Sequence, residues 1–172
     1  MVQTGFFIFV VSSILGWIWE VIITFLFYGK LVNRGMLYGP WLPIYGIGAV
    51  AIFLVAKYSY SPLHVFLISA AGCGVLEYAT SVVMENIWNA RWWNYGGKFN
   101  INGRIDLLVL IVFGAVGLIF YYLVLPNWWW VKLNLEYPLR FVTLIIMAAI
   151  VLDFIYSQVH PNVTSISSHH PF

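Results

Sequence analysis

The chain has 172 residues, of which 62% are hydrophobic and only 8% are charged, and its formal net charge is +2. Its mean hydropathy of +0.89 and its long apolar runs exclude a soluble globular protein and indicate a polytopic membrane protein. The small net charge gives no reason to expect nucleic acid as a partner. The loops between the apolar runs are too short to hold a soluble catalytic or nucleotide-hydrolysing domain.

Five apolar segments of roughly 20 residues predict five transmembrane helices. In chain order they cover residues 5–28, 37–56, 63–84, 107–125 and 139–156. We therefore expect an all-α, polytopic helical membrane protein with a re-entrant or interfacial loop between the third and fourth helices. The predicted transmembrane domain spans residues 1–157. Residues 158–172, which contain several Ser, Pro and His residues, are expected to form a mobile tail.

The first apolar segment carries Ser13, Gly16 and Glu20 at intervals of three and four residues, so these side chains share one helix face. A stripe of small and acidic residues is expected to face protein instead of lipid. The second segment opens with Tyr38-Gly-Pro-Trp-Leu-Pro43, whose two prolines interrupt a helix. Such a break frees backbone groups to meet a ligand or a neighbouring loop.

The third apolar segment repeats a small and acidic stripe at helical spacing. Its members are Ala70, Gly74, Glu77, Ser81 and Glu85. We expect this stripe to be the partner of the stripe on the first helix. Glu20 and Glu77 should each lie about 12 Å inside their helix ends, because a helix rises about 1.5 Å per residue. A carboxylate at that depth costs about 2.5–3.5 kcal/mol unless it is paired, hydrated or protonated. Arg34 and Arg104 are the cations expected on the same side.

The segment 86–106 is dense in polar and aromatic residues. Its Arg91-Trp-Trp-Asn-Tyr95 could form an aromatic belt with a cation over an indole face. Alternatively, the turn formers in Tyr95-Gly-Gly and Asn100-Ile-Asn-Gly favour a loop that folds back on itself. Such a loop would cover a pocket between the first and third helices.

We expect a polar, cytoplasm-facing pocket that binds a small polar or amphiphilic ligand. Its candidate ligand-binding residues are Glu20, Asn33, Arg34, Tyr45, Glu77, Glu85, Arg91, Trp92, Trp93, Tyr95, Asn100, Asn102 and Arg104. The two glutamates would accept hydrogen bonds or couple protons, Arg34 and Arg104 would recognise an anion, and Asn33, Asn102 and Tyr95 would orient the ligand. The alternative is a purely structural role, in which these groups only join the helices through ion pairs.

Two further alternatives are an enzyme and an accessory protein. A membrane enzyme acting on a lipid headgroup could use Glu77 or Glu20 as general base and clamp phosphate with Arg34 and Arg104. An accessory membrane protein would have no ligand of its own. No catalytic residue is assigned, because no Ser, His and acid arrangement stands out.

Neither a cofactor nor a metal is expected. Gly46-Ile-Gly-Ala-Val-Ala51 matches a dinucleotide fingerprint but lies in an apolar segment with no strand before it. Gly96-Gly-Lys98 lacks the first glycine and the Ser or Thr of a phosphate loop. The four histidines have no metal-ligand spacing beyond the adjacent pair His169 and His170, and the single Cys73 lies in an apolar segment.

The distribution of basic residues predicts the orientation of the chain. Lys30, Arg34, Arg91, Lys98 and Arg104 fall on one side of the membrane, and Lys57, Lys132 and Arg140 fall on the other. This excess predicts an N-terminus outside and a C-terminus in the cytoplasm of a plasma-membrane protein. Trp128, Trp129 and Trp130 are expected to anchor the opposite end at the interface.

Several stretches of the chain together resemble a known family. They are Gly16-Trp-Ile-Trp-Glu20, Asn33-Arg-Gly-Met-Leu-Tyr-Gly-Pro-Trp-Leu-Pro-Ile-Tyr-Gly46, Leu76-Glu-Tyr-Ala-Thr-Ser81, Glu85, Arg91-Trp-Trp-Asn-Tyr95 and Phe99-Asn-Ile-Asn-Gly-Arg104. These motifs resemble the bacterial ABC-transporter type IV membrane proteins, from about Gly5 to Leu125. The chain departs from the family pattern at Asn94, where Asp is usual, and at Asp106, where Cys is usual.

The resemblance implies a permease-like transport component of the bacterial inner membrane. Its implied partners are the lipid bilayer and a separate ATPase subunit or another membrane subunit, and a homo-oligomer is an alternative assembly. By its length, the chain is similar to a small substrate-capturing membrane subunit that docks on a separate energising module.

Overall fold

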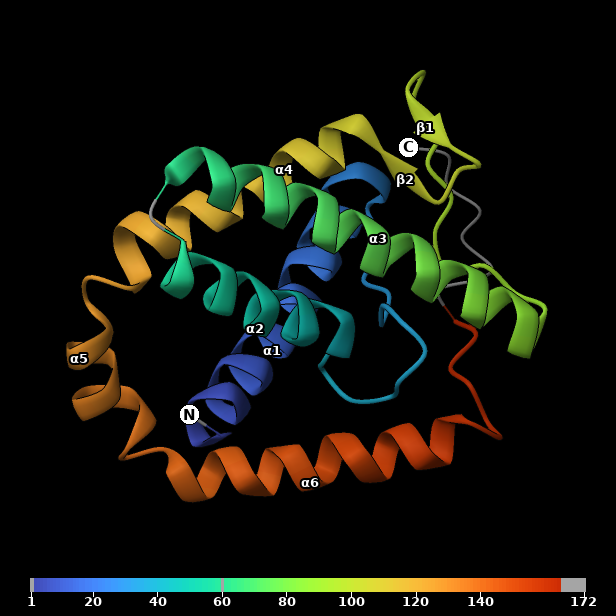
Figure 1. Cartoon of the computed structure of the whole chain (residues 1–172). Helices are drawn as coiled ribbons and strands as arrows, with labels where there is room; N and C mark the ends of the chain where they lie inside the picture. The colour runs from blue at the N-terminus through green and yellow to red at the C-terminus, as the bar shows by residue number, and fades with distance from the viewer. Residues whose placement is uncertain (1, 60, 165–172) are drawn as a thin grey trace.

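The computed structural model describes residues 2–59 and 61–164, and this part of the chain is mainly helical. The helices are α1 (Val2–Tyr28), α2 (Pro43–Tyr58), α3 (Pro62–Trp88), α4 (Leu107–Ile119), α5 (Trp128–Val131) and α6 (Arg140–Ser157), with π-helical turns η1 (Phe120–Val124) and η2 (Lys132–Glu136). Two short strands, β1 (Asn100–Ile101) and β2 (Ile105–Asp106), pair in antiparallel fashion. The predicted all-α membrane class is confirmed (Figure 1).

Four helical segments within the described residues are long and apolar enough to cross a membrane: α1, α3, α4 with η1, and α6. The apolar helix α2 has 16 residues and begins at Pro43, not at residue 37 as predicted. The reason is local, because a residue before proline disfavours the helical conformation and Leu42 is extended at φ −122°. Residues 37–42 therefore form an irregular segment ahead of α2.

The stripe on α1 faces protein, as expected. Ser13 is fully buried, and a Cβ atom at Gly16 would lie 2.6 Å from the Cβ of Tyr45 on α2. The stripe on α3 has another partner, because Gly74 packs against Leu110 of α4. Each stripe therefore packs on a different helix, whereas we had expected them to pack on each other. Helix α2 contacts both α1 and α3.

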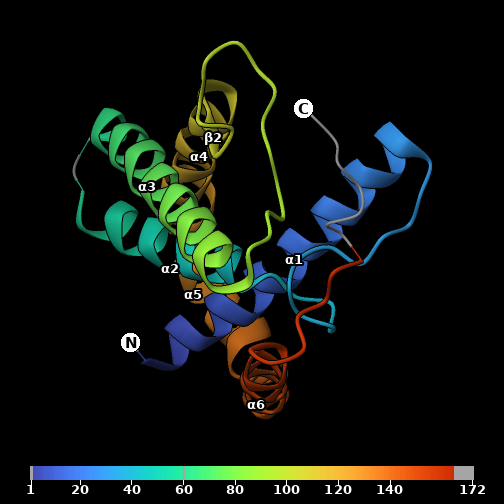
Figure 2. The ribbon, with the colours of Figure 1, turned by 90° about the vertical axis from the view of Figure 1, so that its right-hand side faces the viewer.

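Three connecting segments gather at one end of the molecule, which we call the loop end: residues 29–42, 89–106 and 158–164. Figure 2 faces this end. Asn162 is buried, its backbone N–H donates to the Met36 carbonyl at 2.8 Å, and its own carbonyl accepts from the Trp92 indole at 3.2 Å. The mobility expected for residues 158–172 stays a prediction, and residues 165–172, with His169 and His170, lie outside the described residues.

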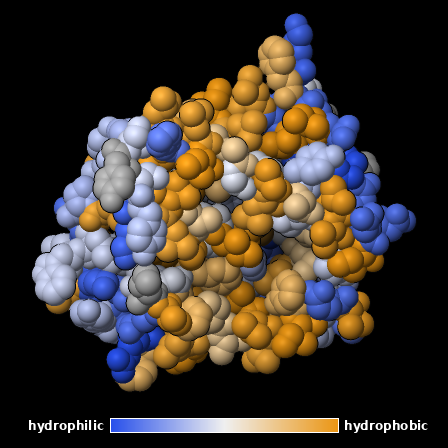
Figure 3. Space-filling view, in the orientation of Figure 1, coloured by the Kyte–Doolittle hydropathy of each residue, from blue (hydrophilic) through white to orange (hydrophobic). Residues whose placement is uncertain are grey.

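The opposite end holds the start of α1, the end of α2, the start of α3 and the segment from α5 to α6. The Thr4 hydroxyl donates to both carboxylate oxygens of Glu136 there, at 3.2 and 3.3 Å. Trp129 and Trp130 are 69% and 60% exposed at this end. Figure 3 shows hydrophobic residues across the middle of the molecule and hydrophilic ones toward its left and right edges. This pattern fits a bilayer that surrounds the middle of the molecule.

Candidate functional site

The segment 89–106 folds back along α3. Helix α3 ends at Trp88, and the next residue, Asn89, has a left-handed φ of 52°. The chain reverses again at Asn102 and Gly103, with φ of 55° and 70°. The Tyr95 N–H closes this hairpin by donating to the Gly103 carbonyl at 2.7 Å. Trp92 is only 5% exposed, so the tryptophans do not all spread along an open loop. Whether the hairpin is re-entrant in a membrane stays a prediction.

Two arginines attach the hairpin to α3 through one carboxylate. The Arg91 Nε lies 2.9 Å from Glu85 Oε2, and the Arg104 guanidinium binds the same oxygen. Arg104 also donates to the Ser81 hydroxyl at 2.9 Å. The amide of Asn102 donates to the Tyr78 hydroxyl at 3.1 Å. Arg104 was one of the two cations expected for the deep glutamates, but its carboxylate partner is Glu85, two turns beyond Glu77 on α3.

Glu77 has a hydroxyl as its hydrogen-bond partner instead of a cation. The Tyr95 hydroxyl donates to Glu77 Oε1 at 2.6 Å. Glu77 is 8% exposed, and its second carboxylate oxygen, Oε2, is buried without a hydrogen-bond partner. A buried polar atom without a partner is rare in native proteins and needs an explanation.

Glu20 is paired with Arg34, one of the two cations expected on the same side, and also binds a tyrosine. The Arg34 Nε lies 3.4 Å from Glu20 Oε2, and Arg34 is 9% exposed. The Tyr45 hydroxyl donates to the other oxygen, Oε1, at 2.5 Å. A tyrosine hydroxyl therefore reaches each deep carboxylate, Tyr45 at Glu20 and Tyr95 at Glu77.

These groups share one electrostatic environment, which we call the polar cluster: Glu20, Arg34, Tyr45, Glu77 and Tyr95. Burial raises the pKa of the Tyr95 hydroxyl far above its usual range, and the negative charges of Glu77 and then Glu20 raise this pKa further. The positive charge of Arg34 acts on the same pKa in the opposite direction. Two carboxylates therefore face a single guanidinium in the cluster, so its formal charge is negative when all three groups are ionised.

Asn33, Asn100 and Trp93 shape the loops around the cluster. Asn33 accepts from the Trp17 indole at 2.6 Å and donates to the Tyr38 carbonyl at 2.8 Å. Asn100 binds within the hairpin turn, where it accepts from the Gly103 N–H at 2.7 Å. The Trp93 indole donates to the Arg104 carbonyl at 3.1 Å. Their polar groups are directed at the backbone or at other side chains of the loop end.

Asp153 on α6 holds the irregular segment before α2, a contact that sequence reasoning missed. Its carboxylate accepts from the Tyr38 and Gly39 N–H groups at 3.2 and 2.8 Å and from the Trp41 indole at 2.8 Å. The prolines at the start of the second apolar segment indicated free backbone donors there. They did not indicate which distant acid would accept from them.

Asp106, at a position where the resemblance led us to expect Cys, caps α4. Its carboxylate accepts from the Leu108 N–H at 2.9 Å, as an acidic N-cap residue does. The other departure, Asn94, lies beside Gly103 in the hairpin. Both positions therefore belong to the hairpin and its exit into α4.

The comparisons with known proteins agree with the helical membrane architecture. No curated protein and no solved structure matches the chain. One family model matches residues 7–158, which is most of the chain, and its description is "Putative ABC-transporter type IV". The match begins within α1, includes the polar cluster and the hairpin, and extends to the end of α6. The chain therefore belongs to this ABC-transporter type IV family of membrane proteins.

Proposed function

We propose that the protein is a permease-like transport component of the plasma membrane whose polar cluster binds a small polar or amphiphilic ligand. The observation that carries this proposal is the unpartnered Oε2 of Glu77, a buried acceptor on a mainly apolar helix. Leaving such an acceptor unsatisfied costs about 1–3 kcal/mol. A hydrogen-bond donor or a positive charge on a ligand would offset that cost.

The neighbouring charges have supporting roles in this proposal. Arg34 is paired with Glu20, and Arg104 is paired with Glu85. These ion pairs hold the segments 29–42 and 89–106 against α1 and α3. In this proposal the ligand binds Glu77. Arg34 and Arg104 bind an anionic group only after their ion pairs with Glu20 and Glu85 have broken.

Energy for transport would come from a separate ATPase subunit, which the family description supports as a partner. The excess of basic residues at the loop end supports a cytoplasmic position for this end. The N-terminus then lies outside and the C-terminus lies in the cytoplasm. An ATPase subunit would therefore dock at the loop end, beside the hairpin that covers Glu77.

The direct test is gentle purification of the protein from its native host, followed by mass spectrometry of copurifying proteins and bound small molecules. We expect an ATPase subunit and a bound polar molecule. Consistent isolation of a lone monomer or homodimer without any ligand would contradict the proposal.

A substitution at Glu77 separates ligand binding from structural support. In Glu77→Gln the amide retains an acceptor for Tyr95 but removes the negative charge, so ligand retention should be lost while the protein accumulates normally. The matched control is Glu136→Gln at the opposite end, another buried carboxylate that accepts from a hydroxyl. Failure of Glu77→Gln to accumulate would instead show that this carboxylate only joins the helices.

A further inference from the structure

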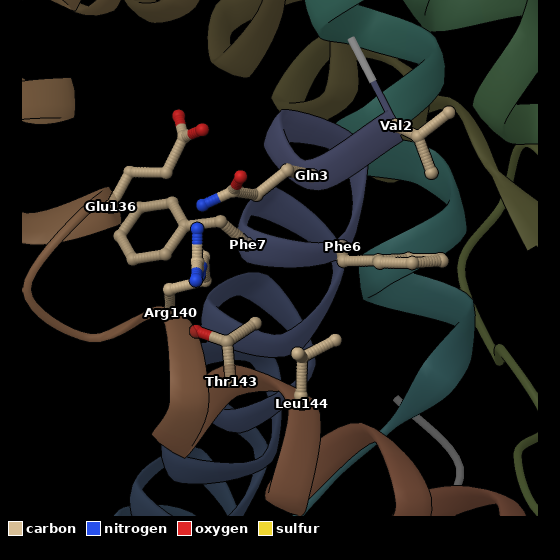
Figure 4. A pocket seen from close by; sticks show the side chains of 8 residues that line it. All are labelled: Val2, Gln3, Phe6, Phe7, Glu136, Arg140, Thr143 and Leu144. Carbon is tan, nitrogen blue, oxygen red and sulfur yellow. The ribbon is translucent and has the colours of Figure 1, made fainter.

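A groove of about 300 Å³ lies at the end opposite the loop end, between the start of α1 and the start of α6 (Figure 4). Its walls are largely apolar and include Val2, Phe6 and Leu144, which are 72%, 38% and 46% exposed. Gln3 and Arg140 also line it. The groove therefore combines an open apolar side with a small number of polar groups.

The two polar groups are both hydrogen-bond donors, and Arg140 is exposed, with its guanidinium 4.9 Å from the centre of the Phe141 ring. Gln3 Nε2 is buried without a hydrogen-bond partner. The Arg140 guanidinium forms none of the ion pairs found among residues 2–59 and 61–164. In Figure 4 the Gln3 amide nitrogen and the Arg140 guanidinium point toward one another. An acceptor placed between them would bind both donors.

The carboxylate that lines the same groove is directed elsewhere. Glu136 is 2% exposed and accepts the Thr4 hydroxyl with both of its oxygens. Figure 4 shows its carboxylate pointing away from the Arg140 guanidinium. Glu136 therefore does not supply an acceptor between Gln3 and Arg140, and this place is open to the polar group of a bound molecule.

The location of the groove indicates the class of that molecule. The groove lies at the same end as the exposed Trp129 and Trp130, and tryptophans are enriched where a bilayer meets water. Lipid headgroups occupy this level of a membrane, and their acyl chains extend from it into the hydrocarbon core. Arginine is suited to phosphate, because its planar guanidinium can donate two parallel hydrogen bonds.

We propose that the groove is a binding site for a phospholipid. The phosphate oxygens accept from Gln3 and Arg140, and the first part of an acyl chain lies along Val2, Phe6 and Leu144. The charge of the phosphate complements the guanidinium, while the apolar wall complements the chain. The site is separate from the polar cluster and does not depend on the function proposed for it.

The test compares dioleoylphosphatidylglycerol with dioleoylglycerol, which has the same chains and no phosphate. Each lipid is added to the purified full-length protein in detergent, and lipid retention is measured by native mass spectrometry. We expect at least tenfold stronger retention of the phospholipid. Arg140→Gln and Gln3→Leu should each reduce phospholipid retention to the level of dioleoylglycerol.

The control is Lys132→Gln in η2, which removes a positive charge at the same end but does not alter a residue that lines the groove. It should retain the phospholipid as the wild type does. Loss of retention in Lys132→Gln as large as in Arg140→Gln would show only a general surface attraction and would overturn the proposal. Equal retention of the two lipids, or unchanged retention in both groove variants, would overturn it as well. Gln3→Leu keeps the test decisive if Arg140→Gln fails to fold.

Discussion

Replacing Gly16 with alanine should destabilise the protein by forcing Tyr45 away from Glu20. The added Cβ would lie 2.6 and 2.7 Å from the Cβ and Cδ1 atoms of Tyr45, which is closer than carbon atoms can approach. The base of this side chain cannot move aside without moving its hydroxyl, which donates to Glu20 at 2.5 Å. One added methyl group therefore disturbs both helix packing and the polar cluster.

The magnitude of the Gly16→Ala effect combines three terms. Overpacking costs about 1–3 kcal/mol, and loss of a hydrogen bond to a charged group costs about 1.5–3 kcal/mol. Alanine recovers about 1 kcal/mol through its higher helix propensity. The net loss is about 3 kcal/mol, which lowers Tm by roughly 6–12 °C for a chain of this size.

The assay is thermal unfolding of the purified protein in detergent, followed by tryptophan fluorescence. The matched control is Gly5→Ala on the same helix, where an added Cβ has no atom within 4 Å. We expect Gly5→Ala to unfold at the wild-type temperature or slightly above it. If Gly16→Ala and Gly5→Ala unfold at the same temperature, the inferred packing of α1 on Tyr45 is wrong.

Three other predictions concern the loop end. Asn162→Ala removes a buried donor to the Leu37 carbonyl and should lower the stability of the loop end by about 1–3 kcal/mol. The measurement is hydrogen exchange in residues 29–42, which should become faster. Asn134→Ala, at an exposed position, is the control and should leave that exchange unchanged. Gly103→Ala places a residue with a Cβ atom at a backbone φ of 70°, which should destabilise the hairpin by about 1–2 kcal/mol. Tryptic cleavage after Lys98 should therefore become faster. An unchanged cleavage rate would contradict this view of the turn. In Lys98→Cys, a membrane-impermeant maleimide should label inverted vesicles but not intact cells, and labelling of intact cells would reverse the proposed orientation.

Hydropathy was sufficient to predict the four long apolar helices, because each apolar segment has to satisfy its backbone hydrogen bonds within itself in a membrane. It did not predict the late start of α2 at Pro43 or the short helix α5. The sequence also indicated Arg34 and Arg104 as the cations available to the two deep glutamates, but it did not assign either arginine to Glu20. The partner of Arg104 was not predictable either. Glu77 and Glu85 lie on one helix stripe, and only the fold of the hairpin decides which of them Arg104 reaches.

The groove at the opposite end could not be predicted from sequence patterns either. Gln3 and Arg140 are far apart in the chain and belong to no motif, so neither residue indicated a site by itself. Asp153 illustrates the same difficulty, since its acceptor role depends on how α6 passes the segment before α2. Contacts between distant segments are set by tertiary packing, which a local pattern does not encode.

The contacts of Asn162 have a consequence for the order in which the protein is made. Asn162 follows α6 in the chain, yet it binds the Met36 and Leu37 carbonyls and the Trp92 indole. Residues emerge from the ribosome from the N-terminus onward. The segments 29–42 and 89–106 therefore form their contacts with Asn162 only after α6 has been synthesised. A product that stops before residue 162 would lack these contacts, and the Met36 carbonyl and the Trp92 indole would lose the partners that Asn162 provides.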